Sequence, residues 1–210
     1  MAVISQIKAT SDNVNYNIRD DYSTWGGRNL LLGTNTQYTS VGNERNSVTE
    51  TTDKFNGCTV FKSSNAWADI GFNFRTQLKD RGVISTGDTL TYSIWAKTDD
   101  TTSRDIYGIW ISGHNASETA NKNYLSGAKI ATLTTNWVQY SYTFTVTADM
   151  MSMTAGGSTR FECNTTCTDG KFIYWAAPKV EKGNKPTDWS PAPEDVARFI
   201  GNETIELYSE

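Results

Sequence analysis

The chain has 210 residues, of which 37% are hydrophobic and 12% aromatic, and its formal net charge is -4 at pH 7. This length and apolar content suit one β-sandwich or barrel with short appendages. The slightly acidic balance, with no run of Lys or Arg longer than two, argues against a surface that binds nucleic acid or an anionic membrane.

The N-terminal residues lack the pattern of a targeting signal. Residues 1–13 have no basic start and no apolar run of signal-peptide length, and nowhere do 18 apolar residues follow one another. We therefore expect a protein that is made in the cytoplasm without a signal peptide and that does not insert into a membrane.

Residues 1–27 are predicted to form an N-terminal extension. The apolar residues around Ile7 and around Tyr16 predict two short extended pieces, which hold too few apolar side chains to form a core alone. We expect this extension to serve attachment or oligomerisation, and Gly26-Gly27 to be the hinge before the main domain.

Residues 28–192 have the pattern of an antiparallel β-sandwich. Segments rich in β-branched and aromatic residues alternate with turn residues, and the predicted strands are 29–32, 58–62, 67–74, 89–98, 105–112, 128–133, 137–146, 160–163 and 171–180. The predicted helices are short, at 74–79 and 193–200. The pattern therefore predicts an all-β, jelly-roll-like sandwich followed by a C-terminal tail, residues 193–210, that starts as a helix.

Two consecutive predicted strands, 89–98 and 105–112, each carry a tryptophan. Because side chains alternate across a strand, Trp95 and Trp110 fall on faces with small and polar neighbours. The opposite, apolar faces are predicted to consist of Tyr92, Ile94 and Ala96 in the first strand and Tyr107, Ile109 and Ile111 in the second. If residues 99–104 close a hairpin, the two indoles form one aromatic platform. In a jelly roll the strands can instead belong to different sheets, and then the rings do not meet.

Catalytic chemistry finds little support in the sequence. His114 is the only histidine, so a Ser-His-Asp or Cys-His triad would depend on this one loop residue. A glycosidase needs two carboxyl groups in a groove. The carboxylates that could serve are Asp69, Asp105, Glu118 and Glu162, but carboxylates are abundant on any acidic surface. We therefore expect a protein that is not an enzyme.

The three cysteines, Cys58, Cys163 and Cys167, are predicted to be free thiols in a reducing compartment. The Cys-x-x-x-Cys spacing at 163–167 lacks a second Cys pair, which argues against zinc. No cofactor is predicted, and a structural Ca²⁺ held by sandwich loops stays open.

Glycan binding is the function that the residue types favour. Sugar rings present apolar C–H patches that stack on aromatic faces, and hydroxyl groups that need polar partners in the same plane. With seven Trp and ten Tyr in the chain, the predicted carbohydrate-binding residues are Trp67, Asp69, Asn73, Trp95, Lys97 and Trp110, with His114 and Tyr124 from the polar loop 112–127 at the rim. The alternative for each ring is packing beneath a loop or a subunit, and this is favoured for Trp137 and Trp175.

Several segments resemble one known family. They are Arg28–Thr34, Tyr92–Lys97, Trp137–Thr145 and, as the most specific part, Phe172–Asp195. Together they look like the carbohydrate-binding-module-like domains of phage tail, baseplate and minor structural proteins, over roughly residues 28–195. The segment Val14–Asp20 is similar to a Tyr-x-Ile-x-Asp element near the start of many tail-fibre proteins.

The resemblance implies a jelly-roll sandwich that adheres to host cell-surface or cell-wall polysaccharide. It also implies a place in the virion, at the tail tip or baseplate, with other virion tail proteins as partners. We expect a homo-oligomer, with a trimer favoured. Two alternatives are a structural virion subunit whose aromatic faces mediate assembly, and an accessory binding module of a cell-wall hydrolase.

Overall fold

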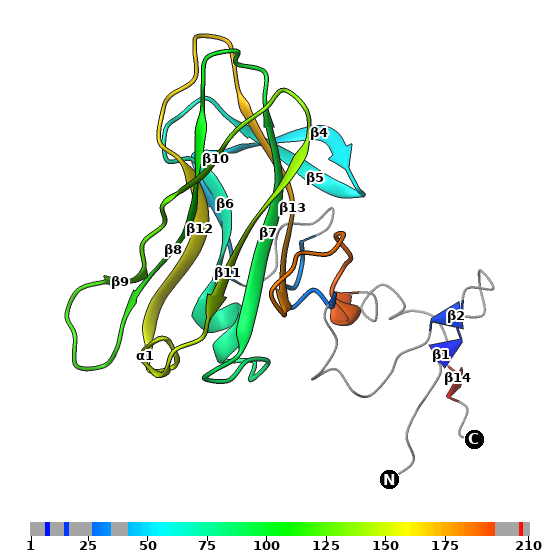
Figure 1. Cartoon of the computed structure of the whole chain (residues 1–210). Helices are drawn as coiled ribbons and strands as arrows, with labels where there is room; N and C mark the ends of the chain where they lie inside the picture. The colour runs from blue at the N-terminus through cyan, green and yellow to red at the C-terminus, as the bar shows by residue number, and fades with distance from the viewer. Residues whose placement is uncertain (1–6, 9–14, 17–26, 35–41, 196–205, 208–210) are drawn as a thin grey trace.

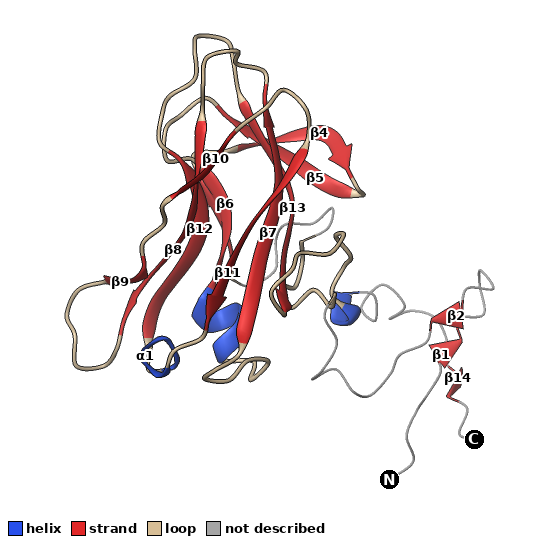
Figure 2. Ribbon diagram, viewed as in Figure 1, coloured by secondary structure: helices blue, strands red, loops and turns tan. Residues whose placement is uncertain are grey.

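The computed structural model describes residues 7–8, 15–16, 27–34, 42–195 and 206–207, which consist mostly of β-strands and their connections (Figure 1). Two antiparallel sheets face each other and enclose a core, and Figure 2 shows how little helix accompanies them. The predicted all-β antiparallel sandwich is therefore confirmed.

The six-stranded sheet has the order β10-β8-β12-β6-β3, and β9 pairs with the second half of β8. Its strands are β3 (Asn43–Asn46), β6 (Asp69–Asn73), β8 (Asp105–His114), β9 (Lys122–Leu125), β10 (Lys129–Thr132) and β12 (Ala155–Cys163). β9 lies in the predicted polar loop 112–127, and β3 lies in a polar stretch where no strand was predicted. Edge strands can form from polar residues because the pairing uses backbone groups.

The five-stranded sheet has the order β11-β7-β13-β5-β4. Its strands are β4 (Thr49–Phe55), β5 (Cys58–Ser63), β7 (Thr89–Thr98), β11 (Val138–Thr145) and β13 (Ile173–Lys182). β4, another polar edge strand, was also missed by the sequence analysis.

Short helical turns connect some strands. The predicted helix at 74–79 is confirmed as the π-helical turn η1 (Arg75–Lys79). An unpredicted turn, α1 (Ala148–Met151), begins where the Thr147 side chain accepts a hydrogen bond from the backbone N–H of Met150. Residues 193–195 are helical, and the rest of the predicted helix 193–200 lies outside the described residues.

The core lies between the sheets and is rich in aromatic residues. Tyr92 is fully buried, with its ring 5.1 Å from that of Phe72 and 4.7 Å from that of Phe161. Its hydroxyl donates to the carbonyl oxygen of Ile70, which satisfies the polar end of a buried tyrosine. Trp175 is also fully buried, as predicted. The three cysteines are free and buried, and burial raises the pKa of Cys58 and of Cys163 to about 12.

β7 and β8 belong to different sheets, so of the two arrangements that the sequence left open, the one in which Trp95 and Trp110 do not meet is correct. The connecting residues 99–104 cross between the sheets around the buried carboxylate of Asp100. This carboxylate accepts hydrogen bonds from the backbone N–H groups of Thr168 and Thr102, which hold its pKa well below the usual range. It also accepts a hydrogen bond from Arg104 over 2.6 Å. Because the buried carboxylate of this polar run has hydrogen-bond partners, residues 99–104 form a crossover between the two sheets rather than a hairpin turn.

A β-bulge in β8 changes the predicted faces of that strand. Arg160 of β12 pairs with Trp110, whereas Glu162, two residues on, pairs with Tyr107, three residues back. The extra residue shifts the alternation. As a result Ile106 and Gly108 are buried with Ile109 and Ile111, and Tyr107 joins Trp110 on the outer face, in contrast to the prediction.

The segment 27–34 is not part of a sheet, so the predicted strand at 29–32 is wrong. It is an extended, buried segment in which the N–H of Leu30 donates to the carbonyl of Val180 over 2.7 Å. The side chain of Asn29 donates to the carbonyl of Ser190 and accepts from the N–H groups of Leu31 and Val180. This segment is therefore fixed between β13 and the residues that follow it.

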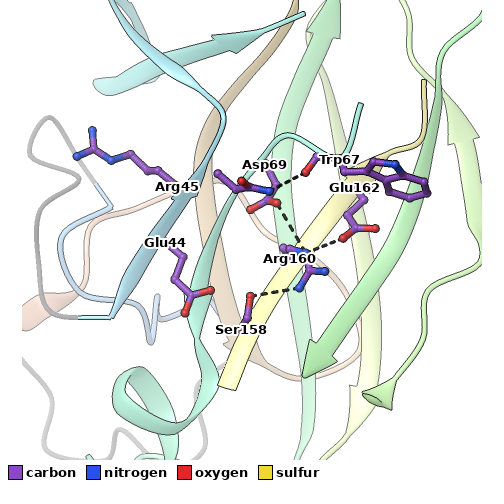
Figure 3. A pocket seen from close by; sticks show the side chains of 8 residues that line it. Glu44, Arg45, Trp67, Asp69, Ser158, Arg160 and Glu162 are labelled. Carbon is purple, nitrogen blue, oxygen red and sulfur yellow. Dashed lines mark hydrogen bonds and ion pairs between the residues drawn. The ribbon is translucent and has the colours of Figure 1, made fainter. Parts of the chain in front are cut away.

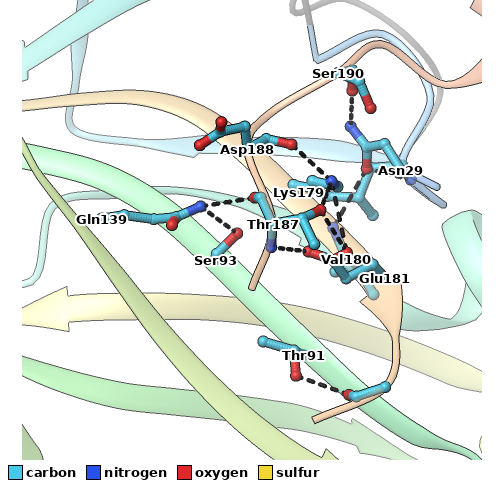
Figure 4. A network of polar contacts seen from close by, with 12 residues as sticks. Asn29, Thr91, Ser93, Gln139, Lys179, Val180, Glu181, Thr187, Asp188 and Ser190 are labelled. Atoms are coloured by element: carbon cyan, nitrogen blue, oxygen red, sulfur yellow. Dashed lines mark hydrogen bonds and ion pairs between the residues drawn. The ribbon is translucent and has the colours of Figure 1, made fainter. Parts of the chain in front are cut away.

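Residues 184–190, which we call the strap, cover part of the outer face of the five-stranded sheet. Figure 4 shows Lys179 and Glu181 of β13 beneath it. Both side chains are at most 1% exposed, and their charged atoms are 3.6 Å apart. Lys179 donates to the hydroxyl of Thr187 and the carbonyl of Asp188, and Glu181 accepts from the N–H of Thr187. The strap thus supplies hydrogen-bond partners to both members of a buried ion pair.

The two ends of the described chain meet in a small sheet. Its order is β14-β1-β2, with β1 at Ile7–Lys8, β2 at Asn15–Tyr16 and β14 at Glu206–Leu207. The extended pieces predicted around Ile7 and Tyr16 are confirmed for these residues, and the rest of the predicted extension lies outside the described ranges. No helix in the described part of the chain is long and apolar enough to cross a membrane.

Candidate functional site

A hollow of about 580 Å³ opens on the outer face of the six-stranded sheet. Figure 3 shows it from close by. It is lined by residues of β3, of β12, of β6 and of the turn before β6: Glu44, Arg45, Asn46, Trp67, Asp69, Ser158, Arg160 and Glu162. Polar side chains therefore form its floor, and one indole lies at its rim.

The register of the sheet produces the hollow. Glu44 pairs with Gly71, Gly71 with Arg160, and Arg160 with Trp110, so these four residues form one row across four strands. Gly71 has no side chain, which leaves space between Glu44 and Arg160, two strands or about 10 Å apart. A Cβ at Gly71 would lie 2.4 Å from the carbonyl oxygen of Thr159, so the close strand packing here requires glycine.

Trp67 is the large hydrophobic side chain that stands out most from the described surface. It is 50% exposed, and its backbone has a φ of +60°, a left-handed conformation that bulky residues rarely adopt. Its N–H donates to the carbonyl of Cys163 and its carbonyl accepts from the side chain of Asn46. Both backbone groups are therefore anchored while the ring stays in solvent at the edge of the hollow. Backbone strain of this kind is concentrated at functional sites.

Arg160 organises the floor of the hollow. Its Nε donates to Glu162 over 2.6 Å, its Nη1 donates to the hydroxyl of Ser158 over 3.2 Å, and its Nε lies 3.7 Å from Asp69 (Figure 3). The guanidinium is held in place by groups on both sides and is 25% exposed. It can therefore present its remaining N–H groups in a fixed orientation.

Asp69 is a carboxyl group in an unfavourable position. It is 2% exposed, and its Oδ2 accepts no hydrogen bond from the described residues. Burial raises its pKa to about 7, against the opposing effects of the Arg160 charge and of the Asn46 side chain. Glu162 and Glu44 raise it further. At neutral pH the carboxyl group is therefore only partly ionised.

Tyr107 and Trp110 form an aromatic pair on the same outer face, with ring centroids 6.3 Å apart. The β8 bulge places both rings outward. Trp110 is next to Arg160 in the register, so it extends the row from the hollow towards β8. The hydroxyl of Tyr107 accepts from the side chain of Asn164, which fixes this ring in place.

The structure brings five of the eight predicted site residues to this face. Trp67 and Asp69 line the hollow, Asn73 and Trp110 pair with residues that line it, and His114 occupies an outward position farther along, at the end of β8. Asn73 donates to Glu44, and a ring nitrogen of His114 lies 2.8 Å from the side-chain oxygen of Asn121.

The other three predicted residues are not part of this face. Tyr124 in β9 packs against the main core, and Lys122 lies over its ring. Trp95 and Lys97 point outward from β7 in the other sheet. There they join a second aromatic cluster of partly buried rings, whose further members are Phe55, Trp137, Tyr174 and Trp189.

This second cluster is held together by its own contacts. The ring of Phe55 stacks on Trp137 at 4.4 Å and lies 5.1 Å from Trp95. The ammonium of Lys97 lies 5.2 Å from the rings of both Trp137 and Tyr174. These side chains therefore partner one another, which agrees with the packing role predicted for Trp137.

Some residues of the hollow were missed in the sequence. Glu44, Asn46, Ser158 and Arg160 lie in polar edge strands or in a strand whose start was placed at residue 160. Glu162 was considered only as one of several carboxylates. The signal that links them is the strand register, which no local pattern encodes. Within the described residues, no group of three or more His, Cys, Asp or Glu side chains is placed to hold a metal ion.

No protein-family model matches the chain, and no curated protein sequence matches it. Solved structures do. The tandem CBM22-1–CBM22-2 domain of Xyn10C from Paenibacillus barcinonensis has a TM-score of 0.53 at 13% identity, covering 81% of this chain and 54% of the tandem. The single CBM22-1 xylan-binding domain of the same protein has a TM-score of 0.47 at 14% identity, covering 77% of this chain and 98% of that domain. The baseplate tripod of bacteriophage Tuc2009 has a TM-score of 0.43 at 16% identity, covering 91% of this chain and 66% of that one. The match to the tandem domain therefore shows that this chain shares its β-sandwich fold.

Proposed function

We propose that residues 28–192 form a non-catalytic module that binds a glycan in the hollow over β6 and β12. The observation that carries this proposal is the exposed, anchored indole of Trp67 beside a floor of fixed polar groups. A sugar ring would stack on Trp67 while its hydroxyl groups exchange hydrogen bonds with Arg160, Glu44 and their neighbours. The fold supports this reading, because it is one that carbohydrate-binding modules use.

The row of residues across the sheet suggests the length of the site. Trp110 and Tyr107 lie on the β8 side of Arg160, so further sugar units of one chain would reach them from the hollow. Stacking at both ends with hydrogen bonds between them is the arrangement that an elongated oligosaccharide requires.

We further propose that the glycan is a host cell-surface or cell-wall polysaccharide, and that the module acts at the tail tip or baseplate of a phage. The sequence resemblance over residues 28–195 supports this. A single open site of this kind binds weakly, and several copies, such as the expected trimer, would supply avidity. The proposed partners are thus the host glycan and neighbouring virion proteins.

The test is adhesion of the purified protein to intact host cells and to walls stripped of polysaccharide. Trp67→Ala and Trp110→Ala are expected to reduce adhesion to cells, and stripping is expected to abolish it. Trp95→Ala, on the opposite sheet, is the matched control. Equal adhesion of all three variants, or full adhesion to stripped walls, would refute the proposal.

A second candidate function is assembly through the aromatic cluster around Phe55, Trp95 and Trp137. Its rings lie on the outer face of the five-stranded sheet and are only partly buried. As a structural virion subunit, the protein would pack this face against another chain. Light scattering after size-exclusion chromatography distinguishes the two, since only this alternative predicts that Trp95→Ala shifts the mass towards the monomer.

Catalysis at the hollow has one observation in its favour, the raised pKa of Asp69 beside Glu162. Burial speaks against it, because the two residues are 2% and 4% exposed and Arg160 lies against both of them. We therefore propose binding without hydrolysis, and release of reducing ends from purified cell wall by this chain alone would contradict it.

A further inference from the structure

The charges that face the hollow do not cancel. Three carboxyl groups line it, those of Glu44, Asp69 and Glu162, together with two arginines, Arg45 and Arg160. Arg45 points to the other side of β3, as Figure 3 shows, with its guanidinium 5.6 Å from the ring of Phe61 and 3.5 Å from Glu50. Only one cation therefore faces three carboxyl groups.

Arg160 is already engaged. Its Nε bonds to Glu162 over 2.6 Å, which makes these two side chains a neutral pair. Asp69 lies farther away, 3.7 Å from the same nitrogen. One guanidinium can offset one carboxylate, so the remaining negative charge belongs to Glu44 and, in part, to Asp69.

Glu44 forms no salt bridge with any side chain in the described ranges, and its carboxylate accepts only the amide of Asn73 there. It lies across the empty position of Gly71 from Arg160. A second observation points to a ligand at the same place. Asp69, which is 98% buried and is one of the residues that line the hollow, has an Oδ2 atom that accepts no hydrogen bond from the described residues.

We propose that the hollow selects glycans that carry a protonated amino group, such as hexosamine units with a free amine, over neutral and anionic ones. The inference rests on the proposed glycan site and names its ligand class. The ammonium group would lie over Gly71, near Glu44 and Asp69, while the sugar ring stacks on Trp67. A carboxylate or phosphate group at this position would face Glu44 with no free cation to offset it.

The experiment titrates intrinsic tryptophan fluorescence with matched oligosaccharides at low ionic strength. The probes are glucosamine oligomers, their fully N-acetylated counterparts of equal length, and galacturonate oligomers. A glycan array adds further pairs of oligosaccharides that differ only in acetylation of the amine. One ion pair at a partly exposed site changes affinity by up to about fivefold, so the free amines are expected to bind about fivefold more tightly than the acetylated forms. Galacturonate is expected to bind most weakly, and added salt to reduce the difference.

Glu44→Gln is expected to bring the ratio between free and acetylated forms close to one, because glutamine keeps an acceptor for Asn73 without the charge. Asp53→Asn is the matched control, since it removes the same charge from an exposed position of β4 in the other sheet and is expected to leave the ratio unchanged. Tight binding of glycans with no preference for the amine would overturn this inference and leave the proposed function standing. Binding of no glycan at all would overturn both.

Discussion

The backbone N–H of Trp67 donates to the carbonyl oxygen of Cys163 over 2.7 Å. Cys163 ends β12 and Trp67 comes just before β6, so this hydrogen bond fixes the turn that leads into the hollow. The turn holds a tryptophan in a left-handed conformation at the surface, where its ring contributes little to the core. Stability and ligand binding can therefore be separated at this residue.

Trp67→Asn should remove glycan binding without unfolding the protein. Asparagine tolerates the left-handed conformation better than other non-glycine residues, and the lost ring is half exposed. We expect affinity to fall at least about tenfold, since stacking of a sugar on an indole is the main apolar contact of the site, while Tm stays within a few degrees. Titration calorimetry and thermal unfolding of the same samples measure both. A large fall in Tm would show that the ring serves packing instead.

Trp110→Ala should weaken glycan binding and Trp95→Ala should lower stability, because the two indoles lie on different sheets. Loss of Trp110 is expected to weaken binding of long oligosaccharides more than that of short ones. Loss of Trp95 is expected to leave binding unchanged and to cost about 2 kcal/mol of unfolding free energy, since its ring packs against Phe55. Glycan titrations and urea unfolding test this pair, and weaker binding in the Trp95 variant would count against a site confined to the six-stranded sheet.

The sequence predicted which side chains face the core correctly for β7 but not for β8. In β7 the alternation gave the right faces, because Tyr92, Ile94 and Ala96 are buried and Trp95 is not. In β8 the same rule failed at Tyr107, since the bulge is set by pairing with β12. Alternation is a local property that a sequence displays, whereas register and bulges depend on neighbouring strands far along the chain.

Asp69→Asn should make the protein more stable at neutral pH. In the native state the pKa of Asp69 is about 7, above its ordinary value of 3.8, so the folded protein binds more protons than the unfolded chain between about pH 4 and pH 7. Its contribution to stability therefore falls as pH rises through this window. The shift of about 3 pKa units corresponds to a cost on the order of 4 kcal/mol above pH 7.

Urea unfolding at a series of pH values measures this effect. The difference in unfolding free energy between Asp69→Asn and the native protein is expected to grow from pH 4 to pH 7 and then to level off. Asp53→Asn, which removes a carboxylate from an exposed position of β4 in the other sheet, is the control. A difference that is independent of pH would mean that Asp69 ionises normally in the folded protein.

Lys179→Met should loosen the strap. The substitution leaves the buried carboxylate of Glu181 without its cation, and breaking a buried pair in this way costs about 3 kcal/mol or more. The double variant Lys179→Met with Glu181→Gln should regain part of this loss, because glutamine still accepts from the N–H of Thr187. Limited proteolysis within residues 184–190 should follow the same order, and equal cleavage rates would contradict the role of the pair.

The sequence nominated some of the residues that line the hollow, but it did not indicate which residues lie next to one another there. The sequence pattern nominated Asp69 and Asn73 because they alternate with the buried Ile70 and Phe72 along β6, and it nominated Trp67 just before that strand. Arg160 and Glu44 were not, since each is an ordinary polar residue until the sheet sets them on either side of Gly71. A hollow that forms across four strands leaves no continuous signal in the sequence.

The salt bridges of Glu194 have a mechanical consequence. Glu194 pairs with Arg28 at the start of the sandwich and with Arg81 after η1, so the segments entering and leaving the domain are tied together. Tension applied between residues 27 and 195 would load the Arg28–Glu194 ion pair before it reaches either sheet. Force applied across the two ends of the domain would therefore break this clasp before it distorted the six-stranded sheet.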